Sequence, residues 1–224
     1  MSENALIPQE LLNQTSTYGD STALEKVSKS SDYLPRIDLL TGNNRFVQDG
    51  VASIGDWALM RDKDNYDEMG RSWVGLLVSW RPVAMRFQPE FEAQYNPDSD
   101  EFKSIEAQAL GGTGLTGAAF GPQYLVWLPE FDTLATWFLG NKTGRNESKN
   151  IIPLLPSEGG TGLINVETQM LSNKKNRWPG PKVSAVELSI ETPPWNDLMD
   201  DVNKFNNPKE GEAPEKAETS DDDR

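Results

Sequence analysis

The chain has 224 residues and a formal net charge of −14, and it contains neither cysteine nor histidine. The lack of cysteine excludes disulfides and thiolate metal sites, and the lack of histidine excludes imidazole metal ligands and Ser-His-Asp catalysis. Seven tryptophans, eight phenylalanines and five tyrosines supply apolar area for one domain, although only 36% of the residues are hydrophobic. The composition predicts a single folded domain with polar segments attached, and it favours a binding protein over an enzyme.

The first 32 residues are polar and rich in serine and threonine, which indicates an N-terminal arm. From residue 33 onward, short runs of β-branched and aromatic residues alternate with turn residues, and this pattern predicts strands. The expected strands are Leu34–Leu40, Asp56–Met60, Trp73–Trp80, Val83–Phe87, Tyr124–Leu128, Ala135–Leu139, Leu163–Met170 and Val183–Ile190. Pro82 lies between two of these runs, where a missing N–H is tolerated.

Apolar residues spaced three and four apart predict a helix over Glu101–Leu110, and a second helix is expected at Trp195–Phe205 after two prolines. Residues 206–224 cannot bury apolar surface, so we expect a disordered acidic tail. The predicted fold is mainly β, an OB-like barrel or a β-sandwich with two or three short helices. The predicted organisation is an arm (1–32), a β-rich nucleic-acid-binding domain (33–205) and the tail.

The charge is distributed unevenly along the chain. Residues 136–183 carry 7 basic and 3 acidic side chains, a net charge of +4, whereas residues 1–135 carry −10 and residues 184–224 carry −8. A basic segment inside an acidic chain indicates an anionic partner. We see no signal peptide and no apolar run long enough to span a bilayer, so we expect a cytoplasmic protein without membrane contact, in the host cytoplasm if it is phage-encoded.

Two stretches combine cations with aromatic rings, as proteins that bind single strands do. Residues 141–150 are interpreted as a polar loop with three cations after the strand that contains Trp137, and residues 173–182 place four cations around Trp178. Either Trp137 or its neighbour Phe138 is expected in the core, because adjacent strand residues face opposite ways. The candidate nucleic-acid contacts are Arg81, Arg86, Trp137, Lys142, Arg145, Lys149, Lys174, Lys175, Arg177, Trp178 and Lys182.

A basic, aromatic-bearing β domain followed by an acidic tail resembles the single-stranded DNA-binding proteins of double-stranded DNA phages. The resemblance covers the domain from about Tyr33 to Ile190 and the tail from about Asn206. Strings such as Ser79-Trp80-Arg81-Pro82 are also similar to those of a group of phage-encoded proteins. The resemblance implies an OB-type fold, sequence-non-specific binding of single-stranded DNA in phage replication or recombination, and docking of replication proteins on the tail. This tail departs from the pattern because it ends in Asp223-Arg224 and not in an aromatic residue.

Two other functions remain open at this point. A phage structural or virion-associated β-sandwich protein without nucleic-acid affinity would use the N-terminal arm to tie subunits into a homo-oligomer. A metal-dependent enzyme would need a carboxylate cluster, and residues Asp62–Glu68 form one. The spacing there does not fit a calcium loop, and a solvated turn explains it more simply. We therefore predict no catalytic residues, no metal and no cofactor.

Overall fold

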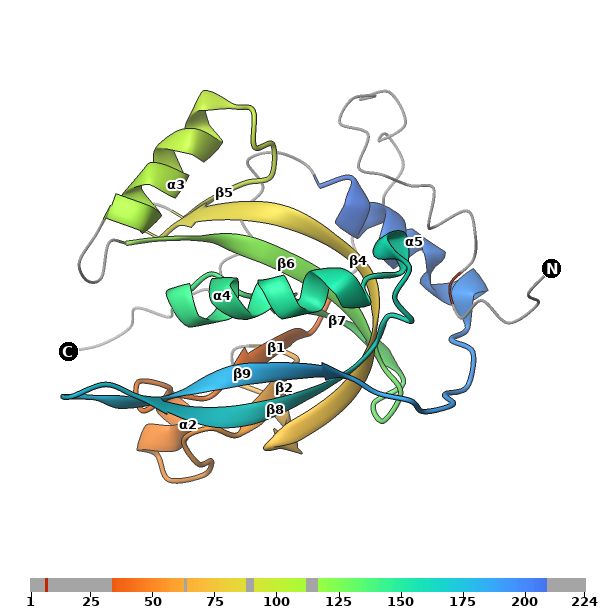
Figure 1. The fold of residues 1–224 in the computed structure, drawn as a ribbon, viewed down its shortest axis with the longest axis horizontal. Helices are drawn as coiled ribbons and strands as arrows, with labels where there is room; N and C mark the ends of the chain where they lie inside the picture. The colour runs from red at the N-terminus through yellow and green to blue at the C-terminus, as the bar shows by residue number, and fades with distance from the viewer. Residues whose placement is uncertain (1–6, 8–33, 63, 88–90, 112–116, 209–224) are drawn as a thin grey trace, which may run out of the picture.

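The computed structural model describes residue 7 and residues 34–62, 64–87, 91–111 and 117–208. In this part of the chain nine strands form a single sheet in the order β3-β2-β1-β7-β6-β4-β8-β9, and β5 pairs with β4 beside this path (Figure 1). The strands are β1 (Arg36–Leu39), β2 (Trp57–Met60), β3 (Tyr66–Gly70), β4 (Ser72–Arg86), β5 (Glu92–Gln94), β6 (Ala118–Leu128), β7 (Thr133–Phe138), β8 (Leu163–Ser172) and β9 (Arg177–Ala185).

Four α-helices accompany the sheet within the described ranges. They are α2 (Arg45–Gln48), α3 (Asp100–Gly111), α4 (Lys142–Ile151) and α5 (Trp195–Asn206), and two 3-10 turns, η1 (Ile152–Leu154) and η2 (Pro156–Glu158), follow α4. The helices predicted at 101–110 and 195–205 are confirmed. The interpretation of residues 141–150 as a loop is wrong, because they form most of α4. The tail from residue 209 and nearly all of the N-terminal arm lie outside the described residues, although Ile7 is 4% exposed and packs with the core.

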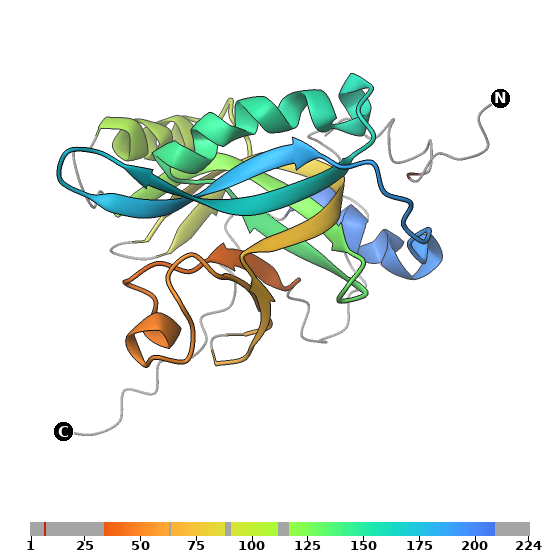
Figure 2. The same cartoon turned by 60° about the horizontal axis from the view of Figure 1, so that its bottom comes forward.

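The prediction of a mainly β fold is confirmed, but the sheet does not close into an OB-like barrel, nor do two sheets form a sandwich. β1 and β7 are parallel and every other pairing is antiparallel. The sheet curls until β9 approaches β1, yet these two strands do not pair, and α4 lies beside β9 (Figures 1 and 2).

The free edge of β9 lacks the amide hydrogens that a further strand would need for pairing. Pro179 and Pro181 have no amide hydrogen, and Val183 donates its own to Oε1 of Glu147 at 2.7 Å. Every second residue of a strand directs its N–H to the same side, so these three positions lie along one edge. Proline and a covering helix are recognised ways of protecting a sheet edge. The Pro-Gly-Pro sequence therefore belongs to an edge strand that begins at Arg177, whereas the predicted strand begins only at Val183.

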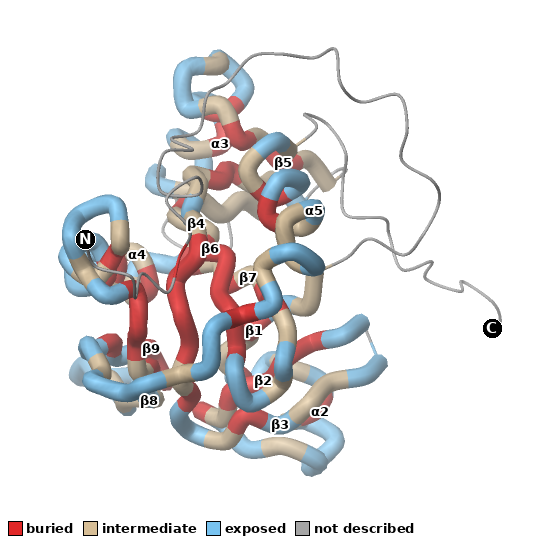
Figure 3. Tube along the Cα trace, turned by 90° about the vertical axis from the view of Figure 1, so that its right-hand side faces the viewer, coloured by how far each residue is buried: buried red, intermediate tan, exposed pale blue. Residues whose placement is uncertain are grey.

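The two faces of the sheet bury different clusters, and β6 contributes to both. Tyr124, Val126 and Leu128 join the larger cluster, whereas Leu125 and Trp127 join the cluster that α5 covers. Burial on both faces explains why this run is apolar throughout and shows no alternation. Figure 3 shows the central strands as the most buried part of the trace. We name the side that carries Tyr124 the α4 face and the other side the α5 face.

Three tryptophans form the centre of the larger cluster. Trp73 and Trp137 lie edge to face with their ring centroids 5.2 Å apart, and Trp57 lies 5.9 Å from Trp73 and 6.1 Å from Trp137. Trp137 is 1% exposed. Its ring is part of the core, where such edge-to-face pairs add to the stability gained by burial.

β4 is a single 15-residue strand, although Pro82 separates the two strands predicted there. Pro82 lies opposite Pro122 of β6. The carbonyl of Pro122 accepts the N–H of Leu139, so the backbone of Pro122 faces β7 and not β4. The two prolines therefore form a pair that exchanges no hydrogen bonds, and the ladder between β4 and β6 loses nothing by their missing amides.

Candidate nucleic-acid interface

α4 is positioned by a side-chain cap and by two small residues. The side chain of Asn141 accepts the N–H of Gly144 at 2.7 Å, which satisfies one of the unpaired amides at the helix start. Gly144 and Ser148 are buried against the sheet, and a Cβ on Gly144 would lie 3.0 Å from that of Leu139. Because this buried face consists largely of small residues, the helix has almost none of the apolar periodicity from which helices are predicted.

Three cations lie on one flank of α4. Lys142, Arg145 and Lys149 are spaced three and four residues apart, which places them on the same side of the helix. Arg145 Nη1 donates to the carbonyls of Phe120 at 2.9 Å and Gly140 at 2.5 Å, so this flank is directed toward β6. Both of these acceptors are neutral, and therefore the guanidinium keeps its net charge. Lys142 and Lys149 are exposed.

The hairpin of β8 and β9 carries four more cations. Oδ1 of Asn173 accepts the N–H groups of Lys175 at 2.9 Å and Asn176 at 2.7 Å, which shapes the tight turn. Lys174 and Lys175 are the two central residues of this turn and are exposed at its tip. Arg177 and Lys182 are exposed along β9.

These two segments, some 35 residues apart in the sequence, lie side by side in space (Figures 1 and 2). Trp178 Nε1 donates to Oγ1 of Thr143 at 3.2 Å, and Glu147 accepts the N–H of Val183. Trp178 packs against the start of α4 and is only partly exposed. We name this region the basic surface, and its residues are Lys142, Arg145, Lys149, Lys174, Lys175, Arg177, Trp178 and Lys182.

The cations of the basic surface are not paired with any carboxylate that the structure describes. Within the described part of the chain, none of its seven cations lies within 4.0 Å of an acidic oxygen. The acidic side chains nearest to it in sequence are engaged elsewhere, since Glu147 accepts from Val183 and Glu167 accepts from Asn165 at 3.3 Å. Like charges gathered without counterions repel one another, and an anionic ligand would relieve that repulsion.

The three other candidate residues lie outside the basic surface. Arg81 is on the α5 face, where its guanidinium donates to the carbonyl of Phe205 at 2.5 Å and lies 4.2 Å from the rings of Phe205 and Tyr95. It therefore fastens α5 to the sheet. Trp137 is buried in the core and cannot stack on a base. We remove both residues from the predicted set.

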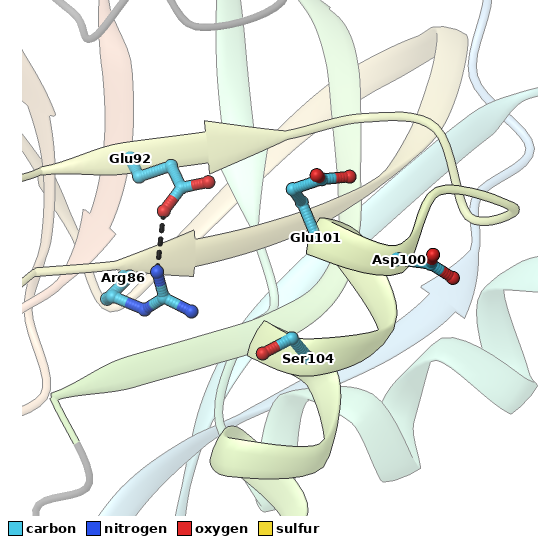
Figure 4. A pocket seen from close by; sticks show the side chains of 5 residues that line it. All are labelled: Arg86, Glu92, Asp100, Glu101 and Ser104. Carbon is cyan, nitrogen blue, oxygen red and sulfur yellow. Dashed lines mark hydrogen bonds and ion pairs between the residues drawn. The ribbon is translucent and has the colours of Figure 1, made fainter.

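Arg86 is neutralised within an acidic pocket. Its Nη1 lies 2.7 Å from Oε2 of Glu92, and the pocket of about 330 Å³ is also lined by Asp100, Glu101 and Ser104 of α3 (Figure 4). Three carboxylates beside one guanidinium make this pocket unfavourable for a phosphate. Arg86 is therefore also removed from the predicted set.

The carboxylate cluster at Asp62–Glu68 forms the turn between β2 and β3. Oδ1 of Asp62 accepts the N–H groups of Asp64 at 2.7 Å and Asn65 at 2.8 Å, as in a solvated turn. Arg45 and Arg61 pair with Asp64 and Asp67. No group of three or more acidic residues with the geometry of a metal site occurs among the described residues.

Sequence reasoning missed two kinds of residue in this region. Thr143 and Glu147 connect α4 to β9. The only local signal for this helix is Asn141, a favoured N-cap residue, followed by three cations at helical spacing. The sequence predicts Trp80 only as the last residue of a strand, whereas the structure shows its side chain 47% exposed.

No protein-family model, curated protein or solved structure matches the chain. No helix within the described ranges is both long enough and apolar enough to cross a membrane.

Proposed function

We propose that the protein binds single-stranded DNA without sequence preference through the basic surface, in the setting of phage DNA replication or recombination that the resemblance implies. The observation that carries this proposal is that none of the seven cations on α4 and the β8–β9 hairpin has an ion-pair partner among the described residues, beside the partly exposed Trp178 and in a chain whose net charge is −14. Docking of replication proteins on the acidic tail remains a prediction.

The chemistry of a single strand fits both components of the basic surface. Lysine and arginine neutralise phosphates and release condensed counterions, which supplies affinity that does not depend on sequence. The exposed part of the Trp178 ring can stack on one base, a contact worth about 1–3 kcal/mol that every base can make. In a duplex both faces of each internal base are already stacked, so the indole favours an unpaired strand.

Titration of intrinsic tryptophan fluorescence with oligo-dT at several salt concentrations tests the proposal. We expect quenching on binding, and an affinity that falls with salt with a logarithmic slope of about −0.7 for each phosphate contact, up to about −5 for seven contacts. Duplex DNA of equal length and oligo-rU are the parallel titrations that establish which polymer is preferred. The absence of both quenching and a salt-dependent anisotropy change would remove this function, and a large closed oligomer in light scattering would then favour the virion-associated alternative.

A further inference from the structure

Trp80 is an exposed aromatic residue on the same face of the sheet as α4. Its two neighbours in β4 are directed to the other face, because Ser79 bonds Asn206 of α5 at 2.6 Å and Arg81 contacts Phe205. Successive strand residues alternate between faces, so Trp80 is directed to the α4 face. It lies there opposite Tyr124 of β6, and it is 47% exposed while Tyr124 is 2% exposed.

This position places Trp80 near the C-terminal end of α4. Directly paired residues on one face have their Cβ atoms about 4.5–5.5 Å apart. The hydroxyl of Tyr124 interacts with the side chain of Ser148 in α4. The next residue, Lys149, lies on the flank of α4 that Arg145 directs toward β6. The exposed indole of Trp80 and the partly exposed indole of Trp178 thus lie toward opposite ends of α4, since Trp178 is bonded to Thr143 in its first turn.

We propose that Trp80 is a second stacking platform and that a single nucleic-acid strand runs along α4 from Trp178 to Trp80. This inference rests on the proposed function and extends it to the path of the strand. The flank from Lys142 to Lys149 is about 10 Å long. That length accommodates about three nucleotides of a stacked strand, whose axial rise is roughly 3.4 Å per nucleotide. A base on each indole with these nucleotides between them requires about five nucleotides in all, within the range of about 4–16 that such sites use.

Phe87 provides a matched control for Trp80. It is 48% exposed and follows the last residue of β4. Its ring contacts Phe91, with centroids 6.0 Å apart, and Phe91 packs against the cluster that contains Val83 and Tyr95. Val83 shares its side of β4 with Arg81, so this cluster is on the α5 face, and removing the Phe87 ring does not change the proposed path.

The test compares W80A, W80F, F87A and W178A for binding of oligo-dT of about 3 and about 12 nucleotides, lengths below and above the proposed site size. W80A is expected to weaken binding of the longer oligonucleotide at least fivefold, while W80F restores most of the affinity and F87A leaves it unchanged. For the short oligonucleotide, W80A should lower the affinity much less than it does for the long one.

Photo-crosslinking of the unaltered protein to 5-iododeoxyuridine oligonucleotides makes the test independent of the folding of W80A. A crosslink at Trp80 supports the path. If crosslinks occur at Trp178 but not at Trp80, and W80A binds like F87A, then the second platform is wrong while the proposed function stands. If the unaltered protein binds neither oligonucleotide, the proposed function and the path both fall.

Discussion

The arginines around β1 to β5 and the cations of the basic surface differ in their partners. Five arginines in the first region each have a carboxylate, namely Arg36 with Asp38, Arg45 with Asp64, Arg61 with Asp67, Arg71 with Asp56 and Arg86 with Glu92. The basic surface has no such pair among the described residues, although the chain contains 35 acidic residues. Within the part of the chain that the structure describes, carboxylates are therefore placed beside the arginines of the first region and not beside the cations of the basic surface.

This difference separates charges that serve the fold from charges left for a ligand. Exposed ion pairs contribute only about 0–1 kcal/mol each, so their absence from the basic surface costs little stability. Positive charge without ion-pair partners attracts a polyanion, whereas it adds nothing to the stability of the fold. Four experiments test whether this difference in partners has the consequences that we expect.

The largest effect is expected on the free energy of unfolding when the buried Trp137 is replaced with alanine, in comparison with the partly exposed Trp178. Trp137→Ala should lower the free energy of unfolding by about 3–5 kcal/mol, because it empties the centre of the buried tryptophan cluster. Trp178→Ala should lower it by about 1–2 kcal/mol through the lost bond to Thr143 and partial burial. Urea denaturation measures both values. Equal destabilisation would show that Trp178 is a core residue and would undermine its role in binding.

Neutralising four cations of the basic surface should remove most of the salt dependence of DNA binding. The variant Lys142→Gln, Lys174→Gln, Lys175→Gln, Arg177→Gln should make the salt slope shallower by about 3, since each phosphate contact to a single strand contributes about 0.7. The affinity at low salt should fall roughly a hundredfold or more. Fluorescence titration at several salt concentrations measures both quantities.

The matched control changes the net charge by the same amount in the other region. It replaces Arg36, Arg45, Arg61 and Arg71 with glutamine. We expect its salt slope to remain close to that of the unaltered protein. Similar losses in the two quadruple variants would mean that overall charge, and not the basic surface, attracts DNA.

Stability at alkaline pH should depend on Tyr124 beneath α4. Burial raises the pKa of Tyr124 to about 12, against an opposing hydrogen bond with Ser148. The pKa of Tyr124 in the folded state lies above the unfolded value of about 10. The contribution of the buried, neutral Tyr124 to the free energy of unfolding is therefore fully present below pH 10 and is lost as the pH rises toward 12. The loss should be about 2 kcal/mol. Urea denaturation of the unaltered protein and of Tyr124→Phe at about pH 9 and pH 11.5 isolates this loss. If the free energy of unfolding falls equally in both proteins between the two pH values, Tyr124 is not its cause.

The smallest effect concerns Glu147, an acidic residue on the helix that borders the basic surface. Glu147→Ala leaves the N–H of Val183 without its acceptor and should lower the free energy of unfolding by about 1–2 kcal/mol, whereas Glu147→Gln retains an acceptor and should cost less. Both variants remove a negative charge, so we expect DNA binding to strengthen slightly. Amide exchange at Val183 and the oligo-dT titration measure the two effects. Weaker DNA binding by the glutamine variant would contradict the electrostatic account.

Several elements could be predicted from the sequence because their signals are local. The helices at 101–110 and 195–205 have apolar residues at helical spacing, and most strands have runs of β-branched and aromatic residues between turns. α4 was not predicted because its buried face consists largely of the small residues Gly144 and Ser148. Most of β9 was not predicted because prolines such as Pro179 and Pro181 are typical of loops unless the strand lies at a sheet edge.

Composition and neighbouring residues were sufficient to identify the basic segment in an acidic chain, the lack of thiol and imidazole chemistry, and most of the secondary structure. The tertiary structure was needed to show that α4 lies beside β9, that Trp137 is buried while Trp80 is exposed and Trp178 partly exposed, and which cations lack a carboxylate partner among the described residues. These properties depend on strand pairings between residues far apart in the chain, such as β4 with β6 and β1 with β7. No local pattern of residues specifies such pairings.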